Sequence, residues 1–191
     1  MTFEGIDGSG KTTVINRIYE ELKKKNFSVV LTKEPTDSWI GRCVQQCIKS
    51  KTDPVVTAFA FISDRIVHGK EIERWLEKYN LVLCDRYAES TYAYQGAQMD
   101  DLVDHPIKWL KELSKERILI PDRTFVFVID PKTSLARIQD RDNLIPFEKV
   151  SFLEKVHKNY LKLSVGKRFL KVDAKKTIDE LVKICYEDIL D

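Results

Sequence analysis

Short apolar runs alternate along this chain with longer segments in which apolar residues recur every three or four positions. The runs predict strands buried on both faces, and the spaced segments predict amphipathic helices. We expect strands at residues 1–4, 28–32, 81–84, 124–129 and 167–172. We expect helices at residues 11–25, 39–50, 53–79, 90–96, 106–115, 132–141, 148–163 and 177–190. This alternation favours a single α/β domain over residues 1–191, with a five-stranded parallel sheet flanked by helices on both faces.

The most specific motif follows the first predicted strand. Residues 5–12 read GIDGSGKT, which fits the phosphate-loop pattern GxxxxGK[ST]. Glycines let the backbone approach a phosphate chain, and the following helix offers free N–H groups. Lys11 would reach the β- and γ-phosphates, and the Thr12 hydroxyl would hold Mg²⁺. The predicted nucleotide cradle comprises Gly5, Ile6, Asp7, Gly8, Ser9, Gly10, Lys11, Thr12 and Thr13.

Acidic residues follow several predicted strands. Ligands of parallel sheets bind outside the carboxyl ends of the strands. We therefore expect one rim of the sheet, at these strand ends, to carry Asp7, Glu34, Asp85 and Asp130. Asp85 could hold Mg²⁺ directly or through water, and the Arg86 guanidinium could bind a phosphate with two hydrogen bonds. The alternative is a capping aspartate beside a surface arginine. The phosphate loop favours the functional interpretation.

Phe61 and Arg65 are four residues apart on a predicted helix and therefore share one face. Such a pair can stack a base and hold the phosphate of the same nucleotide. From spacing alone, core packing of Phe61 and a surface salt bridge of Arg65 are the favoured alternative.

Composition excludes several classes of function. Lys and Arg number 32 and Asp and Glu 30, so the net charge of +2 gives no basic face for nucleic acid. No apolar run approaches membrane-spanning length, and no signal peptide precedes Met1, so we expect a cytoplasmic protein. The four cysteines form no CxxC pair and are interpreted as reduced packing residues. The chain also lacks the NKxD motif with which GTPases read guanine.

Several segments, in order along nearly the whole chain, resemble the thymidylate kinase family. They are FEGIDGSGKTT, KEPT, FISDR, DRYAEST, AYQG and residues 131–148. The resemblance implies a P-loop NTPase fold with sheet order 2-3-1-4-5 and a short lid at about residues 137–148. It also implies transfer of the γ-phosphate of ATP to dTMP with Mg²⁺, in a homodimer.

The resemblance assigns roles to residues on the acceptor side. Phe61 matches the aromatic residue that stacks on thymine, and Arg65 belongs to the same site. Arg86 matches the arginine that binds the dTMP phosphate. Asp7 matches a carboxylate near the sugar 3′-hydroxyl and the reacting phosphates, and Tyr94 matches an aromatic residue that crowds the 2′ position.

Other assignments are left open by the sequence. Ser90, Thr91 and Gln95 match positions that contact the thymine edge, without indicating which of them bonds the base. Arg42 is a further candidate for the monophosphate. The phosphate loop carries no arginine, so a catalytic arginine is expected from the lid, with Arg141 favoured over Arg137. An alternative role for Arg141 is stacking on adenine. A further alternative is that Arg137 and Arg141 are both solvated side chains on a charged helix.

Two other functions compete with this interpretation. One is a kinase of another nucleoside monophosphate or of a deoxynucleoside. The other is a nucleotide-binding regulatory protein that has lost catalysis, which the presence of Lys11, Thr12, Asp85 and Arg86 argues against.

Overall fold

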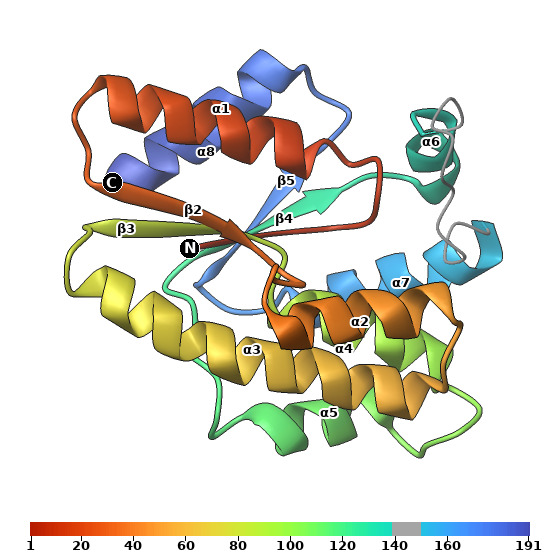
Figure 1. The fold of residues 1–191 in the computed structure, drawn as a ribbon. Helices are drawn as coiled ribbons and strands as arrows, with labels where there is room; N and C mark the ends of the chain where they lie inside the picture. The colour runs from red at the N-terminus through yellow and green to blue at the C-terminus, as the bar shows by residue number, and fades with distance from the viewer. Residues whose placement is uncertain (139–149) are drawn as a thin grey trace.

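The computed structural model describes residues 1–138 and 150–191, and places a five-stranded parallel sheet at the centre of the molecule (Figure 1). The strands are β1 (Thr2–Glu4), β2 (Val29–Lys33), β3 (Leu81–Asp85), β4 (Thr124–Val128) and β5 (Phe169–Asp173). Their order is β2-β3-β1-β4-β5, which confirms the predicted topology. β1 therefore lies between β3 and β4, and the turn after β1 adjoins the end of β3.

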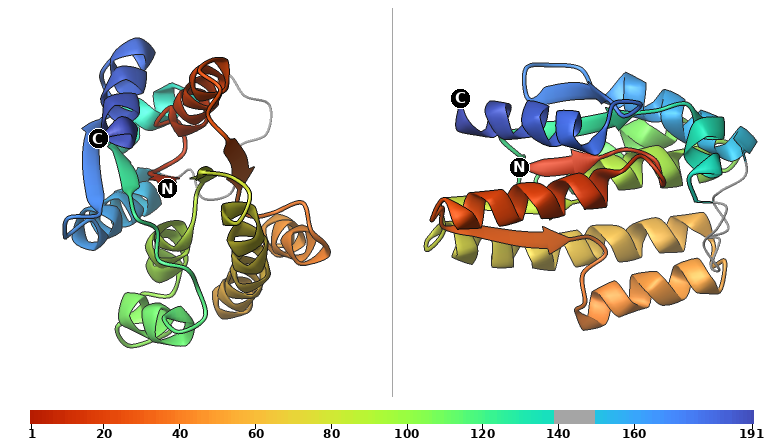
Figure 2. Two further views of the ribbon diagram at one scale, coloured as in Figure 1. Left: turned by 90° about the vertical axis from the view of Figure 1, so that its left-hand side faces the viewer. Right: turned by 90° about the horizontal axis from the view of Figure 1, so that it is seen from above.

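Helices cover both faces of the sheet (Figure 2). They are α1 (Lys11–Lys24), α2 (Trp39–Lys49), α3 (Pro54–Leu76), α4 (Ala88–Gln98), α5 (Pro106–Ser114), α6 (Pro131–Ala136), α7 (Val150–Leu163) and α8 (Ile178–Leu190). α1 and α8 pack together on one face, and α3, α4 and α7 cover the other. α2 packs on the outside of α3, and α5 on the outside of α4. No helix in the described part of the chain is long and apolar enough to cross a bilayer.

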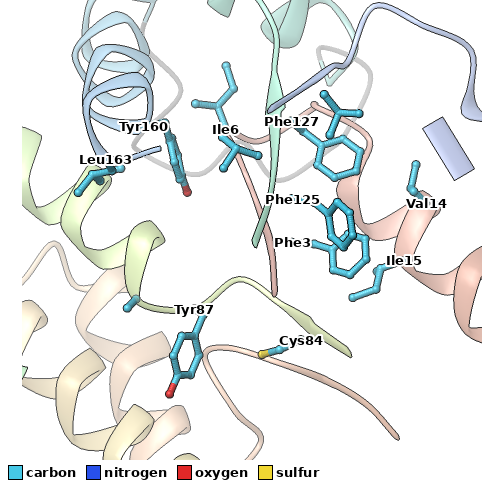
Figure 3. Close-up of a cluster of buried hydrophobic side chains, with 14 of the residues drawn as sticks. Phe3, Ile6, Val14, Ile15, Cys84, Tyr87, Phe125, Phe127, Tyr160 and Leu163 are labelled. Atoms are coloured by element: carbon cyan, nitrogen blue, oxygen red, sulfur yellow. The ribbon is translucent and has the colours of Figure 1, made fainter. Parts of the chain in front are cut away.

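Side-chain alternation along β1 sends neighbouring residues to opposite faces. Phe3 joins the core beneath α1, where its ring lies 4.8 Å from that of Phe125 and 6.2 Å from that of Phe127 (Figure 3). Glu4 points to the other face, where it contacts α4 and α7. The last residue of β1 is thus a buried carboxylate beneath two helices.

Most predicted elements are confirmed, with shifts at their ends. α3 ends at Leu76 rather than at residue 79, because a turn at residues 77–78 begins the connection to β3. α4 begins at Ala88 rather than at residue 90. α6 ends at Ala136, and residues 137–138 form a turn. Residues 139–141 of the helix predicted at 132–141, and residues 148–149 of the one predicted at 148–163, lie outside the described residues.

Candidate active site

The phosphate loop connects β1 to α1. Gly8 has a φ of 77°, and a Cβ there would lie 2.4 Å from the Ser134 carbonyl oxygen, so only glycine fits. Gly10 precedes α1 with a φ of 89° and gives the helix no side-chain cap. The first N–H groups of α1 are therefore left for an anion, and Thr12 and Thr13 lie exposed on this first turn.

Lys11 is buried at the start of α1, and its Nζ donates to the Ile6 carbonyl oxygen at 3.2 Å. Burial, and after it the positive charge of Arg86, lowers the pKa of Lys11 to about 8. A bound polyphosphate would add negative charge beside Lys11 and so favour its protonated form.

Thr12 and Asp85 form a candidate Mg²⁺ site. The Thr12 hydroxyl donates to Asp85 Oδ2 at 2.6 Å, and Asp85 Oδ1 is buried without a partner among the described residues. Hydroxyl and carboxylate oxygens suit Mg²⁺, so these residues fit the ion. Residues 1–138 and 150–191 contain no cluster of three His, Cys, Asp or Glu that could bind a metal alone. Phosphates and water would therefore supply the remaining ligands.

The other two acidic residues predicted at the rim have structural partners. Glu34 accepts from Arg65 and contacts His68. Asp130 caps α6 by accepting from the N–H groups of Lys132 and Thr133. Asp7 and Asp85 are left as the carboxylates beside the phosphate loop.

A pocket lies beside the phosphate loop, between the start of α4 and the middle of α3. Its lining residues are Asp7, Glu34, Pro35, Ile48, Phe61, Arg65, Arg86, Tyr87, Ser90, Tyr94 and Gln95. Seven of the sequence-predicted site residues are among them. Thr91 and Arg42 are not: Thr91 is buried behind the wall, and Arg42 is exposed on α2 and donates to the Asp37 carbonyl oxygen at 2.9 Å.

Arg86 links this pocket to the phosphate loop. Its Nη2 donates to Asp7 Oδ1, and its Nη1 donates to Ser90 Oγ at 3.1 Å and to the Gly5 carbonyl oxygen at 3.3 Å. Burial alone would raise the pKa of Asp7, but the charges of Arg86 and Lys11 outweigh it and lower that pKa. Asp7 is therefore ionised and holds Arg86 at the junction.

Arg65 is fully buried, and its charge is already balanced. Its Nε donates to Glu34 Oε2 at 2.8 Å, and its Nη2 donates to the Tyr87 carbonyl oxygen and to Thr91 Oγ1. Its Nη1 is buried without a partner among the described residues. This arrangement favours a role at a neutral base, with a single free donor, over the phosphate-binding role that spacing suggested.

The α4 residues divide into those with occupied and those with free polar atoms. The Ser90 hydroxyl contacts Glu4, Arg86 and Tyr160, and the Thr91 hydroxyl accepts from Arg65. Gln95 Nε2 donates to Gln98, whereas Gln95 Oε1 is buried with no partner in the described ranges. The Tyr94 hydroxyl donates to Asp7 Oδ2 at 2.9 Å and accepts from the Asp7 N–H.

The arginines predicted for the lid are separated by the end of the described segment. Arg137 Nη1 donates to the Ala174 carbonyl oxygen at 3.0 Å, which ties it to the turn between β5 and α8. Arg141 lies outside the described residues, and its role stays a prediction.

The sequence interpretation missed Glu4. Its signal is a carboxylate at the end of a strand predicted to be buried on both faces, a position where burial demands partners. Those partners come from α4 and α7, more than eighty residues further along the chain.

Comparison with known proteins gives a consistent result. A family model described as thymidylate kinase matches residues 3–184. A relative from Methanosarcina acetivorans, named probable thymidylate kinase, is 37% identical over all of this chain and 95% of its own length. Another so named, from Sulfurisphaera tokodaii, is 38% identical over 96% of this chain and 91% of its own. The family match extends over the phosphate loop, the pocket and the helices that carry it.

Proposed function

The chain belongs to the thymidylate kinase family, and we propose that the pocket and phosphate loop described above carry out the reaction of that family. The protein transfers the γ-phosphate of ATP to dTMP, giving dTDP and ADP, with Mg²⁺. The assignment of these residues to the reaction rests on the position of Arg86. Its side chain lines the acceptor pocket and also donates hydrogen bonds to Asp7 and Gly5 of the phosphate loop. The Arg86 guanidinium can therefore bind the phosphate of the acceptor next to the γ-phosphate of the donor.

Charge neutralisation is the main demand of phosphoryl transfer, because negative charge spreads over the transferred group. The loop N–H groups and Lys11 would bind the β- and γ-phosphates of ATP. Thr12 and Asp85 would hold Mg²⁺, which when bound neutralises charge on those phosphates. Arg86 would bind the dTMP phosphate and orient it, while Asp7 keeps the guanidinium in place.

The unpaired atoms of the pocket suit the edge of thymine. Thymine presents an acceptor at O4 beside a donor at N3–H. Within the described part of the chain, Arg65 Nη1 is a donor and Gln95 Oε1 an acceptor without a partner. Cytosine presents the reverse pattern and would leave both groups unsatisfied, a mismatch that discriminates strongly. Of the three candidates for the base edge, Gln95 is therefore preferred over Ser90 and Thr91, whose hydroxyls are occupied.

Tyr94 and Asp7 would face the sugar. Their hydrogen bonds fix the tyrosine ring beside the phosphate loop. A ring fixed there would exclude a 2′-hydroxyl by contact and would favour deoxyribose. Phe61, half-buried in the same wall, would stack on the base.

A coupled ADP-release assay with a panel of nucleosides and monophosphates tests this function. We expect turnover with dTMP, much less with dCMP, and none with thymidine. Turnover restricted to dCMP or CMP would refute the base assignment, and thymidine phosphorylation would refute the role of Arg86. An absence of turnover with every acceptor would favour a regulatory protein that only binds nucleotides.

We further propose a homodimer, working in the cytoplasm, formed through the outer face of α3. Val56, Phe59 and Val67 are exposed on this helix, with 51%, 48% and 40% of their surfaces accessible. Phe59 also meets Trp109 of α5 edge to face, with ring centroids 5.8 Å apart. An apolar stripe of this kind, continued on a neighbouring helix, suits a second copy of the same surface.

A further inference from the structure

Glu4 is a fully buried carboxylate immediately before the phosphate loop. Its Oε1 accepts from the backbone N–H groups of Tyr87 at 2.7 Å and Ser90 at 3.2 Å. Its Oε2 accepts from the hydroxyls of Ser90 at 2.6 Å and Tyr160 at 3.1 Å. Four donors from α7 and the start of α4 thus surround a side chain that does not line the pocket.

The first consequence concerns the start of α4. The residue that precedes this helix, Tyr87, provides no side-chain cap. Glu4 takes that role from a different element, because its Oε1 binds the first N–H groups and its charge meets the positive end of the helix dipole. α4 carries Ser90, Tyr94 and Gln95 of the pocket wall, so one carboxylate fixes that wall to the phosphate loop.

The second consequence concerns Arg86. Because the Ser90 hydroxyl gives its proton to Glu4, its oxygen is left to accept from Arg86 Nη1 at 3.1 Å. A neutral carboxyl group could itself donate to Ser90, and the serine hydroxyl would then be free to turn. The negative charge of Glu4 therefore sets the direction of the hydrogen bonds that hold one side of the Arg86 guanidinium.

We propose that Glu4 is a positioning residue for phosphoryl transfer, whose carboxylate fixes Arg86 against the phosphate loop through Ser90 and ties both to α7 through Tyr160. The inference rests on the role proposed for Arg86 at the acceptor phosphate. Glu4 touches neither substrate in this arrangement and acts only through these partners.

The electrostatic surroundings make this role sensitive to pH. Burial, and then the negative charge of Glu89, raises the pKa of Glu4 to about 7, against the opposing effects of Ser90, Arg86 and the Tyr87 N–H. The charged or titratable groups that face it are Lys11 of α1, Cys84 of β3, Arg86, Glu89 of α4 with its partner Arg168, and Tyr160 of α7. The positioning form is the ionised one, so it is present above pH 7 and lost as the pH falls below it.

The test is Glu4→Gln, which keeps the shape of the side chain and removes the charge. At pH 8 we expect kcat/KM for dTMP to fall roughly tenfold or more, with KM for ATP within about twofold of wild type. The deficit should shrink towards pH 6, where wild-type Glu4 is itself protonated. Inflections from substrate phosphates occur in every variant and cancel in this comparison.

Thermal unfolding separates positioning from a merely structural role. Because folding raises the pKa of Glu4, its ionisation above pH 7 lowers stability, and Glu4→Gln should unfold at pH 8 no lower than wild type. A variant that loses stability but keeps the wild-type kcat/KM and pH profile would overturn the proposal. So would a stable variant with unchanged kcat/KM at pH 8.

Two further variants test the assignment even if Glu4→Gln does not fold. Glu89→Gln removes a negative neighbour and should move the acidic limb of the profile to lower pH. Tyr160→Phe removes a donor to the charged form and should move it to higher pH. If the acidic limb of the pH profile stays in place in both variants, Glu4 does not control activity. Wild-type turnover of dTMP distinguishes this failure from failure of the proposed function.

Discussion

At the scale of single residues, two arginines of the site are paired with carboxylates, while a few buried polar atoms have no partner among the described residues. Arg65 is balanced by Glu34 and Arg86 by Asp7. The unpaired atoms among the described residues include Asp85 Oδ1, Arg65 Nη1 and Gln95 Oε1. Unsatisfied buried groups are costly, so their presence at one rim points to ligands that complete them.

The sequence predicts only in part which polar groups of the site are paired and which are not. Phe61 and Arg65 share one helix face, as their spacing predicts, and both line the pocket. The alternative favoured from spacing alone, a surface salt bridge of Arg65, is wrong, because Arg65 is fully buried. The partner of Arg65, however, is Glu34 on another segment, and no periodicity reveals a contact across 31 positions. The same limit applies to Glu4 and to Arg42, because the first depends on α7 and the second on how α2 is turned relative to the pocket.

Lys11 should take up a proton when ATP binds at alkaline pH. Burial and the neighbouring Arg86 lower the pKa of Lys11 to about 8, so part of the free protein carries a neutral lysine at pH 8.5. Bound phosphates favour the charged form and raise that pKa again. Calorimetric titration in two buffers of different ionisation enthalpy should show proton uptake at pH 8.5 and little at pH 6.5. Lys11→Met should abolish the uptake and nearly all turnover, and uptake that persists in this variant would assign the proton to another group.

Two substitutions at Tyr94 should separate its hydroxyl from its ring. Tyr94→Phe removes the hydrogen bonds to Asp7 but keeps the ring, so we expect a lower kcat and unchanged preference for deoxyribose. Tyr94→Ala also opens the space beside the sugar and should raise the ratio of ribose to deoxyribose turnover by roughly tenfold or more. The measurement is kcat/KM for dTMP and for its ribose counterpart in both variants. Equal discrimination by Tyr94→Ala and wild type would remove the steric explanation.

At the scale of helices and strands, the way an element is buried determines how well its position can be predicted from the sequence. The strands are predictable because strands covered on both faces leave continuous apolar runs in the sequence. α4 begins two residues before its predicted start, because ten of its eleven residues are buried and it shows no apolar stripe. Its beginning is set by Glu4 from another part of the chain, which a local capping signal cannot reveal.

The exposed stripe of α3 carries a prediction about assembly. Val67→Glu would place a charge without a partner inside the proposed interface and should weaken dimerisation by roughly a hundredfold or more. Sedimentation over a range of protein concentrations measures the change. Val165→Glu is the matched control, because Val165 is 75% exposed and precedes β5, which two strands of the sheet separate from β3, the strand that α3 contacts. A wild-type protein that stays monomeric, or a Val67→Glu protein that dimerises normally, would contradict the proposal.

At the scale of the whole molecule, strand order determines which ligands can meet. Because β1 lies between β3 and β4, the phosphate loop adjoins the turn that carries Asp85 and Arg86. The register pairs Phe3 with Asp85, which puts the end of β3 beside the start of the loop. Donor and acceptor phosphates are therefore expected between Lys11 and Arg86, with the two nucleosides extending in opposite directions along the rim.

A bisubstrate analogue tests this arrangement as a whole. Adenosine and thymidine joined 5′ to 5′ through a polyphosphate long enough to represent both substrates should bind with one molecule per chain. Because a single ligand would then occupy both sites, it should compete with ATP and with dTMP and should raise the unfolding temperature more than either substrate alone. The matched control is the same pair joined by only two phosphates, which is too short to place both nucleosides and should displace one substrate at most. Binding that displaces dTMP while ATP still binds would mean that the acceptor lies away from Lys11, and the common site at the sheet rim would be wrong.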